Sequence, residues 1–185
     1  MNDCSSILDD EFQILRVTSN LYNEVEELLV NVSVNQEFGC LINNIKESPI
    51  AIDELRKLIR HILSLGISFA IRHVESGRIV AGIANIIFMW DAVDSSFDIN
   101  EHCQLDSTFE MEYMGTSPEF RGRGLATILC KHSFRLAKEM SQGTLQPELF
   151  AQLPEEMQIE RPQAVVAITT SYTSRNMARK LEMQT

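Results

Sequence analysis

The sequence is poor in the residues that cross-link small secreted folds and build metal centres. Its 185 residues include four cysteines and four histidines, with no close cysteine pair and no zinc-ligand spacing. These residues are Cys4, Cys40, Cys103, Cys130, His61, His73, His102 and His132. The N-terminus also lacks a basic segment followed by an apolar run, so no secretion signal is expected. The sequence therefore predicts reduced thiols, no metal site and a cytoplasmic location.

Long hydrophobic runs and an excess of positive charge are missing as well. The longest apolar run, Ile79 to Trp90, is interrupted by Asn85 and is shorter than the roughly 20 residues that span a bilayer. Sixteen basic residues against 26 acidic ones give a net charge of −10, which argues against nucleic acid because phosphate backbones bind clustered cations. We expect no membrane and no nucleic acid as a partner. A cationic small amine suits this charge better, while an acidic surface also serves solubility alone. No pattern indicates an oligomeric state.

Length and composition are those of one compact domain. Apolar residues make up 44% of the chain, enough for a core, and we expect a single domain over residues 1–185 with its core from about residue 12. Strands are expected at Phe12–Val17, Ser68–Val74, Arg78–Trp90, Phe109–Met114 and Ala164–Thr170. Helices are expected at Leu21–Val30, Ile52–Leu65, Leu125–Met140 and from about Ser174. Irregular stretches are expected at Asp91–Ser107 and Gln142–Pro162.

The fourth expected strand has strict alternation. Phe109, Met111 and Tyr113 alternate with Glu110 and Glu112. In an extended chain this places the three large side chains on one face and the two glutamates on the other. The pattern predicts a half-buried strand.

A loop rich in arginine and glycine follows this strand and leads into a helix. The loop reads Arg121-Gly122-Arg123-Gly124-Leu125-Ala126. Backbone N–H groups and the positive end of the macrodipole at a helix N-terminus hold a phosphate or pyrophosphate. The spacing matches neither a Walker loop nor a dinucleotide-binding fingerprint. From the residues alone, the loop is either an anion site or a glycine-rich turn.

A strand, a Ser-Pro pair and then Arg-x-x-Gly-x-Ala at the start of a helix resemble the acetyl-CoA signature of the GNAT superfamily of N-acetyltransferases. Arg121, Gly124 and Ala126 occupy its three fixed positions. The order of expected elements is also similar to that of the family. Among its branches, the chain looks most like the insect arylalkylamine N-acetyltransferase-like proteins, because of the long loop after the helix, the Arg161-Pro162 pair and the segment Thr170–Arg175.

The resemblance implies an α+β, GNAT-type acyl-CoA N-acyltransferase fold, with a mixed central sheet that is splayed at the motif strand and has helices on both faces. It implies an enzyme that transfers acetyl from acetyl-CoA to a primary amine, an arylalkylamine in this branch, by direct attack. The family continues with two further strands where this sequence stops at Thr185, so we expect a C-terminally truncated version of the fold. Two alternatives stand beside this: a catalytically weak acyl-CoA-binding or interaction protein, and an acetyltransferase for protein or peptide amines.

The resemblance also assigns the acetyl-CoA site. The motif strand is expected to hold the pantetheine arm through the backbone of Met114, Gly115 and Thr116. The loop is expected to bind the pyrophosphate through Arg121, Gly122, Arg123, Gly124, Leu125 and Ala126.

Two places offer a carboxylate as general base. Glu110 and Glu112 lie on the motif strand, where some family members carry theirs, and they are otherwise two outward glutamates of an amphipathic strand. Glu37 lies in a segment loosely similar to one that provides a catalytic glutamate in insect enzymes, with Phe38-Gly39 in place of Pro-Leu. A general base requires a suitable pKa and reach, so all three residues remain candidates.

The leaving thiolate needs a proton donor. The register that holds a tyrosine in many members here gives Ala178, and insect relatives use serines near the start of the last helix, where this chain has Ser171 and Ser174. A serine ahead of a helix is also an N-cap, and Ser174 is expected to be one. His132 lies on the apolar side of the motif helix and is expected to be a packed side chain.

Overall fold

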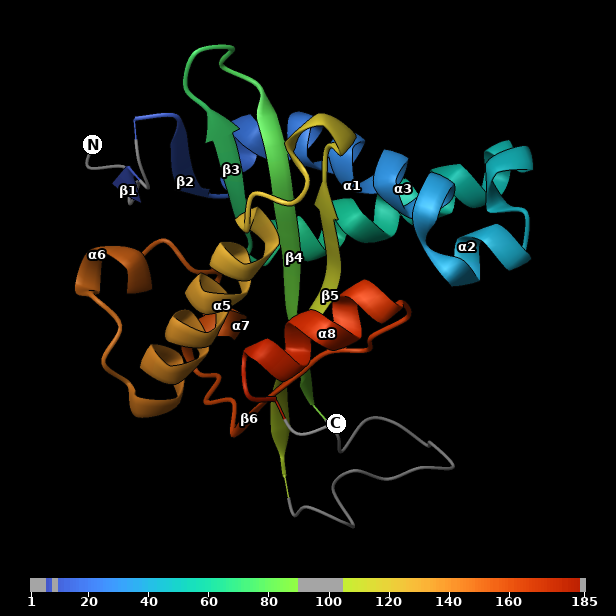
Figure 1. Cartoon of the computed structure of the whole chain (residues 1–185). Coiled ribbons are helices and arrows are strands. Elements are labelled where there is room, and N and C mark those ends of the chain that lie inside the picture. The colour runs from blue at the N-terminus through green and yellow to red at the C-terminus, as the bar shows by residue number, and fades with distance from the viewer. Residues whose placement is uncertain (1–5, 8–9, 90–104, 184–185) are drawn as a thin grey trace.

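A computed structural model describes residues 6–7, 10–89 and 105–183, and its strands join in one sheet with helices on both faces (Figure 1). The strands are β1 (Ser6–Ile7), β2 (Phe12–Arg16), β3 (Phe69–His73), β4 (Ile79–Met89), β5 (Ser107–Thr116) and β6 (Ala164–Val166). The helices are α1 (Tyr22–Gln36), α2 (Phe38–Ile42), α3 (Pro49–Ser64), α5 (Leu125–Gln142), α6 (Pro147–Phe150), α7 (Glu155–Gln158) and α8 (Tyr172–Lys180). Short 3-10 turns are η1 (Ser19–Leu21), η2 (Ile45–Glu47) and η4 (Pro118–Phe120).

The strands follow the chain order from β1 to β6 across the sheet. Neighbouring strands are antiparallel except for β5 and β6, which run parallel. The expected mixed sheet with helices on both faces is therefore confirmed. Among the described residues, no helix is both long enough and apolar enough to cross a bilayer.

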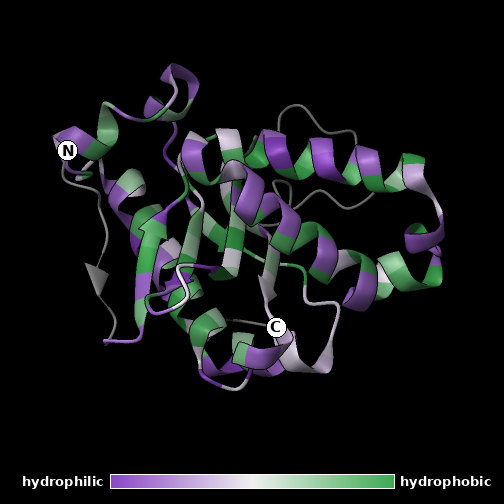
Figure 2. Cartoon of the chain, turned by 90° about the horizontal axis from the view of Figure 1, so that it is seen from above, coloured by the Kyte–Doolittle hydropathy of each residue, from purple (hydrophilic) through white to green (hydrophobic). Residues whose placement is uncertain are grey.

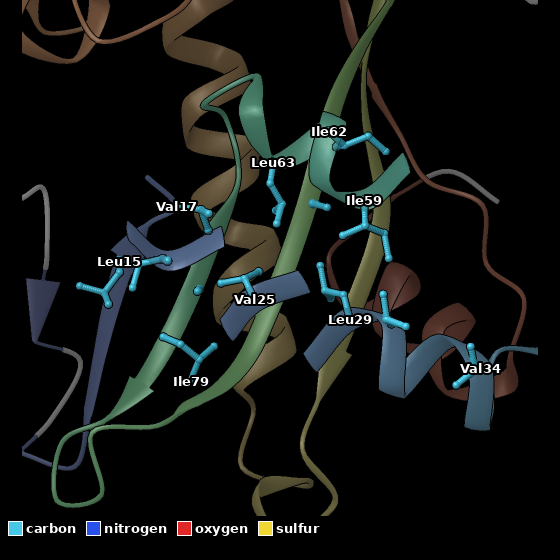
Figure 3. Close-up of a cluster of buried hydrophobic side chains, with 13 residues drawn as sticks. Leu15, Val17, Val25, Leu29, Val34, Ile59, Ile62, Leu63 and Ile79 are labelled. Carbon is cyan, nitrogen blue, oxygen red and sulfur yellow. The ribbon is translucent and has the colours of Figure 1, made fainter. Parts of the chain in front are cut away.

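Helices α1 and α3 cover one face of the sheet. Val25 and Leu29 of α1 and Ile59 and Leu63 of α3 are each at most 1% exposed (Figure 3). Burying each such side chain contributes roughly 1.5–3 kcal/mol, so this cluster fixes the two helices against the sheet. Figure 2 shows hydrophobic and hydrophilic residues alternating along these helices, as expected for amphipathic elements.

Helices α5 and α8 lie on the opposite face. Leu125, Leu129 and Cys130 of α5 are buried against Ile71 and Ile83 of the sheet. Lys131, Arg135 and Lys138 of α5 are exposed, and the amphipathic helix predicted at Leu125–Met140 is confirmed. A glycine in the left-handed region, Gly143 at φ 64°, ends it.

A close approach of α1 to the sheet depends on two paired glycines. Gly82 of β4 lies opposite Gly115 of β5. A Cβ at Gly115 would lie 3.0 Å from the Cβ and Cγ2 atoms of Val32, and one at Gly82 would lie 3.3 Å from Val25 Cγ1. Helix α1 can pack this close to β4 and β5 because neither glycine has a side chain.

Asn85, which interrupts the longest apolar run, is fully buried and hydrogen-bonded. Its Nδ2 donates to the Ile67 carbonyl at 2.8 Å and to Ser133 Oγ of α5 at 3.0 Å, and its N–H donates to Ser68 Oγ at 3.1 Å. These partners compensate the desolvation of the amide. The interruption is thus a polar link between β4, the two residues just ahead of β3, and α5.

A β-bulge interrupts the side-chain alternation expected for β5. Met111 pairs with Asn85 and Tyr113 pairs with Ala84, so Glu112 has no opposite residue on β4. Phe109 and Met111 face α5, whereas Tyr113 packs with the α1 and α3 cluster and Met114 packs with the α5 side. The prediction that Tyr113 shares a face with Phe109 and Met111 was wrong because the extra residue shifts the side-chain period by one.

Several boundaries differ from the sequence prediction. Helix α1 continues to Gln36 and α3 begins at Pro49, while β6 ends at Val166 rather than Thr170. The stretch Gln142–Pro162, expected to be irregular, contains α6 and α7. The loop expected at Asp91–Ser107 falls mostly outside the described residues, and its last residue begins β5.

We expect Gly115→Ala to destabilise the protein by about 1–3 kcal/mol, because the new methyl forces α1 away from β5. Urea unfolding measures this loss. Val32→Ala in the Gly115→Ala background should recover part of it by removing the Cγ atoms at 3.0 and 3.1 Å, with Val32→Ala alone as the control. Equal unfolding midpoints for Gly115→Ala and the parent would contradict the close approach.

Candidate active site

The bulge and the short β6 strand open the sheet beside β5. Strand β6 pairs with β5 only at Thr108, Glu110 and the residue between them, yet β5 continues to Thr116. Beyond Val166 the chain runs as an irregular segment to α8, which lies in front of β5 (Figure 1). The predicted splay at the motif strand is therefore present.

The opening beside β5 forms a cavity of about 720 Å³. Its walls come from the bulged half of β5, the loop before α5, the segment 167–171, α8, and the facing sides of α1 and α2. Most residues predicted for the site line it: Glu37, Glu112, Met114, Gly115, Thr116, Arg121, Gly122, Gly124, Leu125, Ala126, Ser171 and Ser174. Glu110 and Arg123 do not.

The glycine loop ends at an uncapped helix N-terminus. Gly122 and Gly124 have φ of 76° and 81°, a region that favours glycine. Gly124 is the N-cap of α5, and no side chain caps the helix there. The first helical hydrogen bond runs from Ile128 N to the Gly124 carbonyl at 3.1 Å, so the N–H groups of residues 125–127 have no partner within the helix.

The loop is also open. A Cβ placed at Gly122 or Gly124 would meet nothing within 4 Å. An anion can therefore approach the backbone N–H groups and the positive end of the α5 dipole without displacing a side chain. The residues present fit a pyrophosphate.

The two arginines of the loop differ. Arg121 lines the cavity, donates from Nε to the Thr116 carbonyl at 3.3 Å and is hydrogen-bonded to Gln36 of α1. The Arg123 side chain turns away to Glu11, just ahead of β2, so only its backbone remains beside the two glycines. No local sequence pattern distinguishes the two arginines, because Glu11 lies 112 positions from Arg123.

Glu37 lies in the cavity as the N-cap of the short helix α2, and its Oε2 accepts from the Cys40 N–H at 2.7 Å. Burial raises the pKa of Glu37, but hydrogen bonds from the backbone of Gly39 and Cys40 and from the side chains of Cys40 and Thr170 outweigh burial and hold that pKa below its usual value. The carboxylate stays ionised and is suited to attract a cation.

Glu112 is the carboxylate placed at the bulge. Its side chain lines the cavity, and partial desolvation by the surrounding walls raises its pKa. Burial also raises the pKa of Glu110, against a hydrogen bond from Thr108. Glu110, however, lies opposite Val166 where β6 is still paired, so the bulge separates the two glutamates that the sequence placed together.

Tyr113 and Cys40 were not predicted as site residues, yet both line the cavity. Burial raises the pKa of Tyr113 to about 12, with the charges of Glu112, Cys40 and Glu37 adding to the effect. Burial likewise raises the pKa of Cys40, beside Glu37. With a raised pKa, both groups keep their protons at neutral pH and have a proton available to donate. The regular alternation of β5 gave no sign that Tyr113 turns into the cavity.

The two serines cap α8 together. Ser174 N–H donates to Ser171 Oγ at 3.0 Å, Ser171 N–H donates to Ser174 Oγ at 3.1 Å, and the two hydroxyl oxygens are 2.9 Å apart. The expectation that Ser174 is the N-cap was wrong, because α8 begins at Tyr172 and Ser171 holds that position. Both hydroxyls line the cavity but already serve the capping box.

Other candidate groups lie elsewhere. His132 packs against the Phe69 ring at 5.8 Å, and burial lowers its pKa. Within the described ranges, no group of three or more His, Cys, Asp and Glu side chains is arranged to hold a metal ion. Cys4, Cys103 and His102 lie outside the described residues.

A family model decides the assignment: the model described as "Acetyltransferase (GNAT) family" matches residues 46–152. The chain belongs to the GNAT acetyltransferase family. It is by family an acyltransferase, and acetyl-CoA is the family's cosubstrate. No curated protein sequence is significantly similar to it.

Solved GNAT structures share the fold at low identity. A protein of the yellow fever mosquito Aedes aegypti that is named as an arylalkylamine N-acetyltransferase 7 has a TM-score of 0.72 at 12% identity, and the match covers 94% of this chain and 73% of that one. The polyamine N-acetyltransferase of Drosophila melanogaster has a TM-score of 0.64 at 15% identity, covering 93% and 82%. Glucosamine-6-phosphate N-acetyltransferase of Arabidopsis thaliana has a TM-score of 0.54 at 15% identity, and the match covers 95% of this chain and 93% of that one.

The opposite pKa shifts of Glu112 and Glu37 predict opposite effects on stability. The raised pKa of Glu112 means that the folded state holds its proton more tightly than the unfolded chain, so its contribution is intact below pH 4.5 and is lost as the pH rises through the folded pKa. Glu112→Gln should therefore raise Tm slightly at pH 7 and leave it unchanged near pH 4.

The effect of Glu37 on the pH dependence of stability has the opposite sign. Its lowered pKa gives stability that is present above pH 4.5 and is lost as the pH falls through the folded pKa. Glu37→Gln should cost about 0.5–2 kcal/mol at pH 7, as for an N-cap, and less in acid. Thermal unfolding of both variants from pH 4 to 7 checks this, and Tm changes of the same sign at pH 7 would contradict it.

Proposed function

We propose that this protein transfers the acetyl group of acetyl-CoA to a primary amine, an arylalkylamine in particular, by direct attack. One observation carries the proposal. The cavity joins an open, uncapped helix N-terminus at Gly124, suited to an anion, to the bulged strand at Glu112, so that this helix end and an ionisable carboxylate line the same cavity.

The donor end is formed by backbone. The N–H groups of residues 122–126 would hold the pyrophosphate, and the backbone of Met114, Gly115 and Thr116 would hold the pantetheine arm. Acetyl-CoA supplies the thioester that is attacked. The bulge leaves Glu112 without an opposite residue on β4, and the backbone N–H groups of the bulged segment would meet the developing negative charge on the carbonyl oxygen.

The acceptor end is formed by side chains. Ionised Glu37 would attract the ammonium form of the amine into the cavity. Glu112, with its raised pKa, would then take a proton so that the neutral amine can attack. Tyr113 keeps its phenol proton and is a candidate donor for the leaving thiolate.

The acceptor class has two supports. Apolar side chains such as Leu55 and Met111 line the cavity together with the two carboxylates, which suits an amine with an apolar body. The structural neighbours also include enzymes named for arylalkylamines, polyamines and agmatine. We further propose a cytoplasmic location, in accord with the free thiols of Cys40 and Cys130.

Acetyl-CoA should bind the parent protein in calorimetry, and Gly124→Glu should weaken binding more than tenfold by filling the cradle with a carboxylate. Gly77→Glu is the matched control, since Gly77 also has a positive φ, 68°, and open space but lies in the β3–β4 turn. A folded parent that does not bind would refute the proposal. Equal losses in both variants would refute the assignment of the loop.

Glu112→Gln should lower kcat about 100-fold, because the amine then lacks its proton acceptor, while the KM for acetyl-CoA stays the same. Glu110→Gln, on the same strand but outside the cavity, should keep near-parental activity. An acetylation assay with phenylethylamine, tryptamine, agmatine and a peptide amine measures both and ranks the acceptors.

Three results in that assay would contradict the proposed reaction. A larger loss of kcat in Glu110→Gln than in Glu112→Gln would show that Glu112 is not the general base. Donor binding without turnover of any amine would indicate an acyl-CoA-binding protein. Turnover of the peptide amine alone would indicate a protein acetyltransferase.

A further inference from the structure

Arg123 sits between the two positive-φ glycines of the anion-binding loop, but its side chain leaves the cavity. Both terminal nitrogens pair with the two carboxylate oxygens of Glu11, the residue that precedes β2. This two-pronged contact has a defined geometry, unlike a single contact between flexible side chains. It ties the loop to a strand at the far side of the sheet.

The guanidinium of Arg123 also rests on an aromatic platform. Its Cζ lies 4.7 Å from the centre of the Phe12 ring, within range of a cation–π interaction. The Phe12 ring meets Phe120 edge to face at 6.1 Å, and Phe120 ends the η4 turn at the start of the loop. Both ends of the segment 120–123 are therefore held by residues 11–12.

The carboxylate of Glu11 has a second neighbour. His73 Nε2 of β3 lies 3.6 Å from Glu11 Oε1, and the His73 ring lies 5.0 Å from Phe120 and 5.7 Å from Phe12. The Glu11 backbone is anchored as well, because its carbonyl accepts from Val74 N–H at 2.9 Å. Glu11 is thus positioned by β3 and offers Arg123 a fixed partner.

The loop needs such an anchor. No atom lies within 4 Å of the position where a Cβ would stand at Gly122 or Gly124, so packing does not fix these two residues. Glycine also has the widest conformational freedom of any residue. Backbone N–H groups bind an anion well only when they already point at it, since ordering them during binding costs affinity.

We propose that Glu11 is a positioning residue that holds the anion-binding loop in its binding shape through Arg123. This inference rests on the proposed function, because it concerns the affinity of that same site for acetyl-CoA. The contrary view is that Glu11 withdraws Arg123 from the ligand, in which case removing Glu11 would tighten binding. The two views predict opposite signs.

Glu11→Gln should weaken acetyl-CoA binding about 3- to 10-fold, as should Arg123→Gln, because a two-pronged exposed ion pair is a modest interaction. The double variant should bind acetyl-CoA no more weakly than whichever single variant binds it less tightly, because both substitutions break the same contact. KM for acetyl-CoA should rise by the same factor, with kcat and the KM for the amine unchanged. Glu139→Gln, which breaks the Arg135–Glu139 pair on the outer side of α5, is the matched control and should bind like the parent.

Calorimetry with acetyl-CoA on the four variants and the parent tests the inference, with Tm recorded for each. Additive losses in the double variant, tighter binding by Glu11→Gln, or a loss of equal size in Glu139→Gln would each overturn it, as would binding by Glu11→Gln equal to that of the parent. A parent that does not bind acetyl-CoA would instead overturn the proposed function, which keeps the two failures apart.

Discussion

One extra residue in β5 is the constraint on which the site depends. Glu112 has no partner on β4, and the bulge that results bends and twists the strand. Strand β6 follows β5 only as far as Glu110, two residues before the bulge. Beyond that point the two strands separate and their side chains and backbone face a cavity instead of each other.

The same residue sets the electrostatics of the cavity. The bulge turns Glu112 into partly desolvated surroundings that raise its pKa, while Glu37 is held ionised by the N–H groups of α2. Two carboxylates of one cavity thus have opposite tendencies, one to take up a proton and one to stay charged. Such a division suits a reaction that must first attract an ammonium ion and then deprotonate it. The close approach of α1 through Gly115 and Gly82 brings the α2 end of this arrangement near β5.

The sequence predicted best where the signal was local. The helical spacing from Leu125 predicted α5, and the glycines at 122 and 124 have the backbone conformation that only glycine adopts easily. The start of α3 was predicted three residues late although Ser48-Pro49 is a recognisable N-cap followed by proline. That boundary could have been found from the sequence.

Features that arise from tertiary contacts could not be found in this way. The alternation of Phe109 to Met114 is perfect in the sequence, so it hides the bulge that separates Glu110 from Glu112 and turns Tyr113 to the other face. The early end of β6 lies beside that bulge, and the β-branched residues that follow Val166 give no sign of it. The Glu11–Arg123 pair and the Glu37–Thr170 contact join residues more than a hundred positions apart, and no local pattern encodes them.

The central claim is that the glycine loop and the bulged strand form one acyl-CoA site. The most direct measurement follows the backbone amide signals of isotope-labelled protein by NMR as acetyl-CoA is added. The account predicts concerted shifts of the amides of Gly122, Gly124 and Ala126 together with those of Glu112 to Thr116, and no shift at Gly143, at the opposite end of α5. Saturable binding that leaves either the loop or the bulged strand unshifted would contradict it.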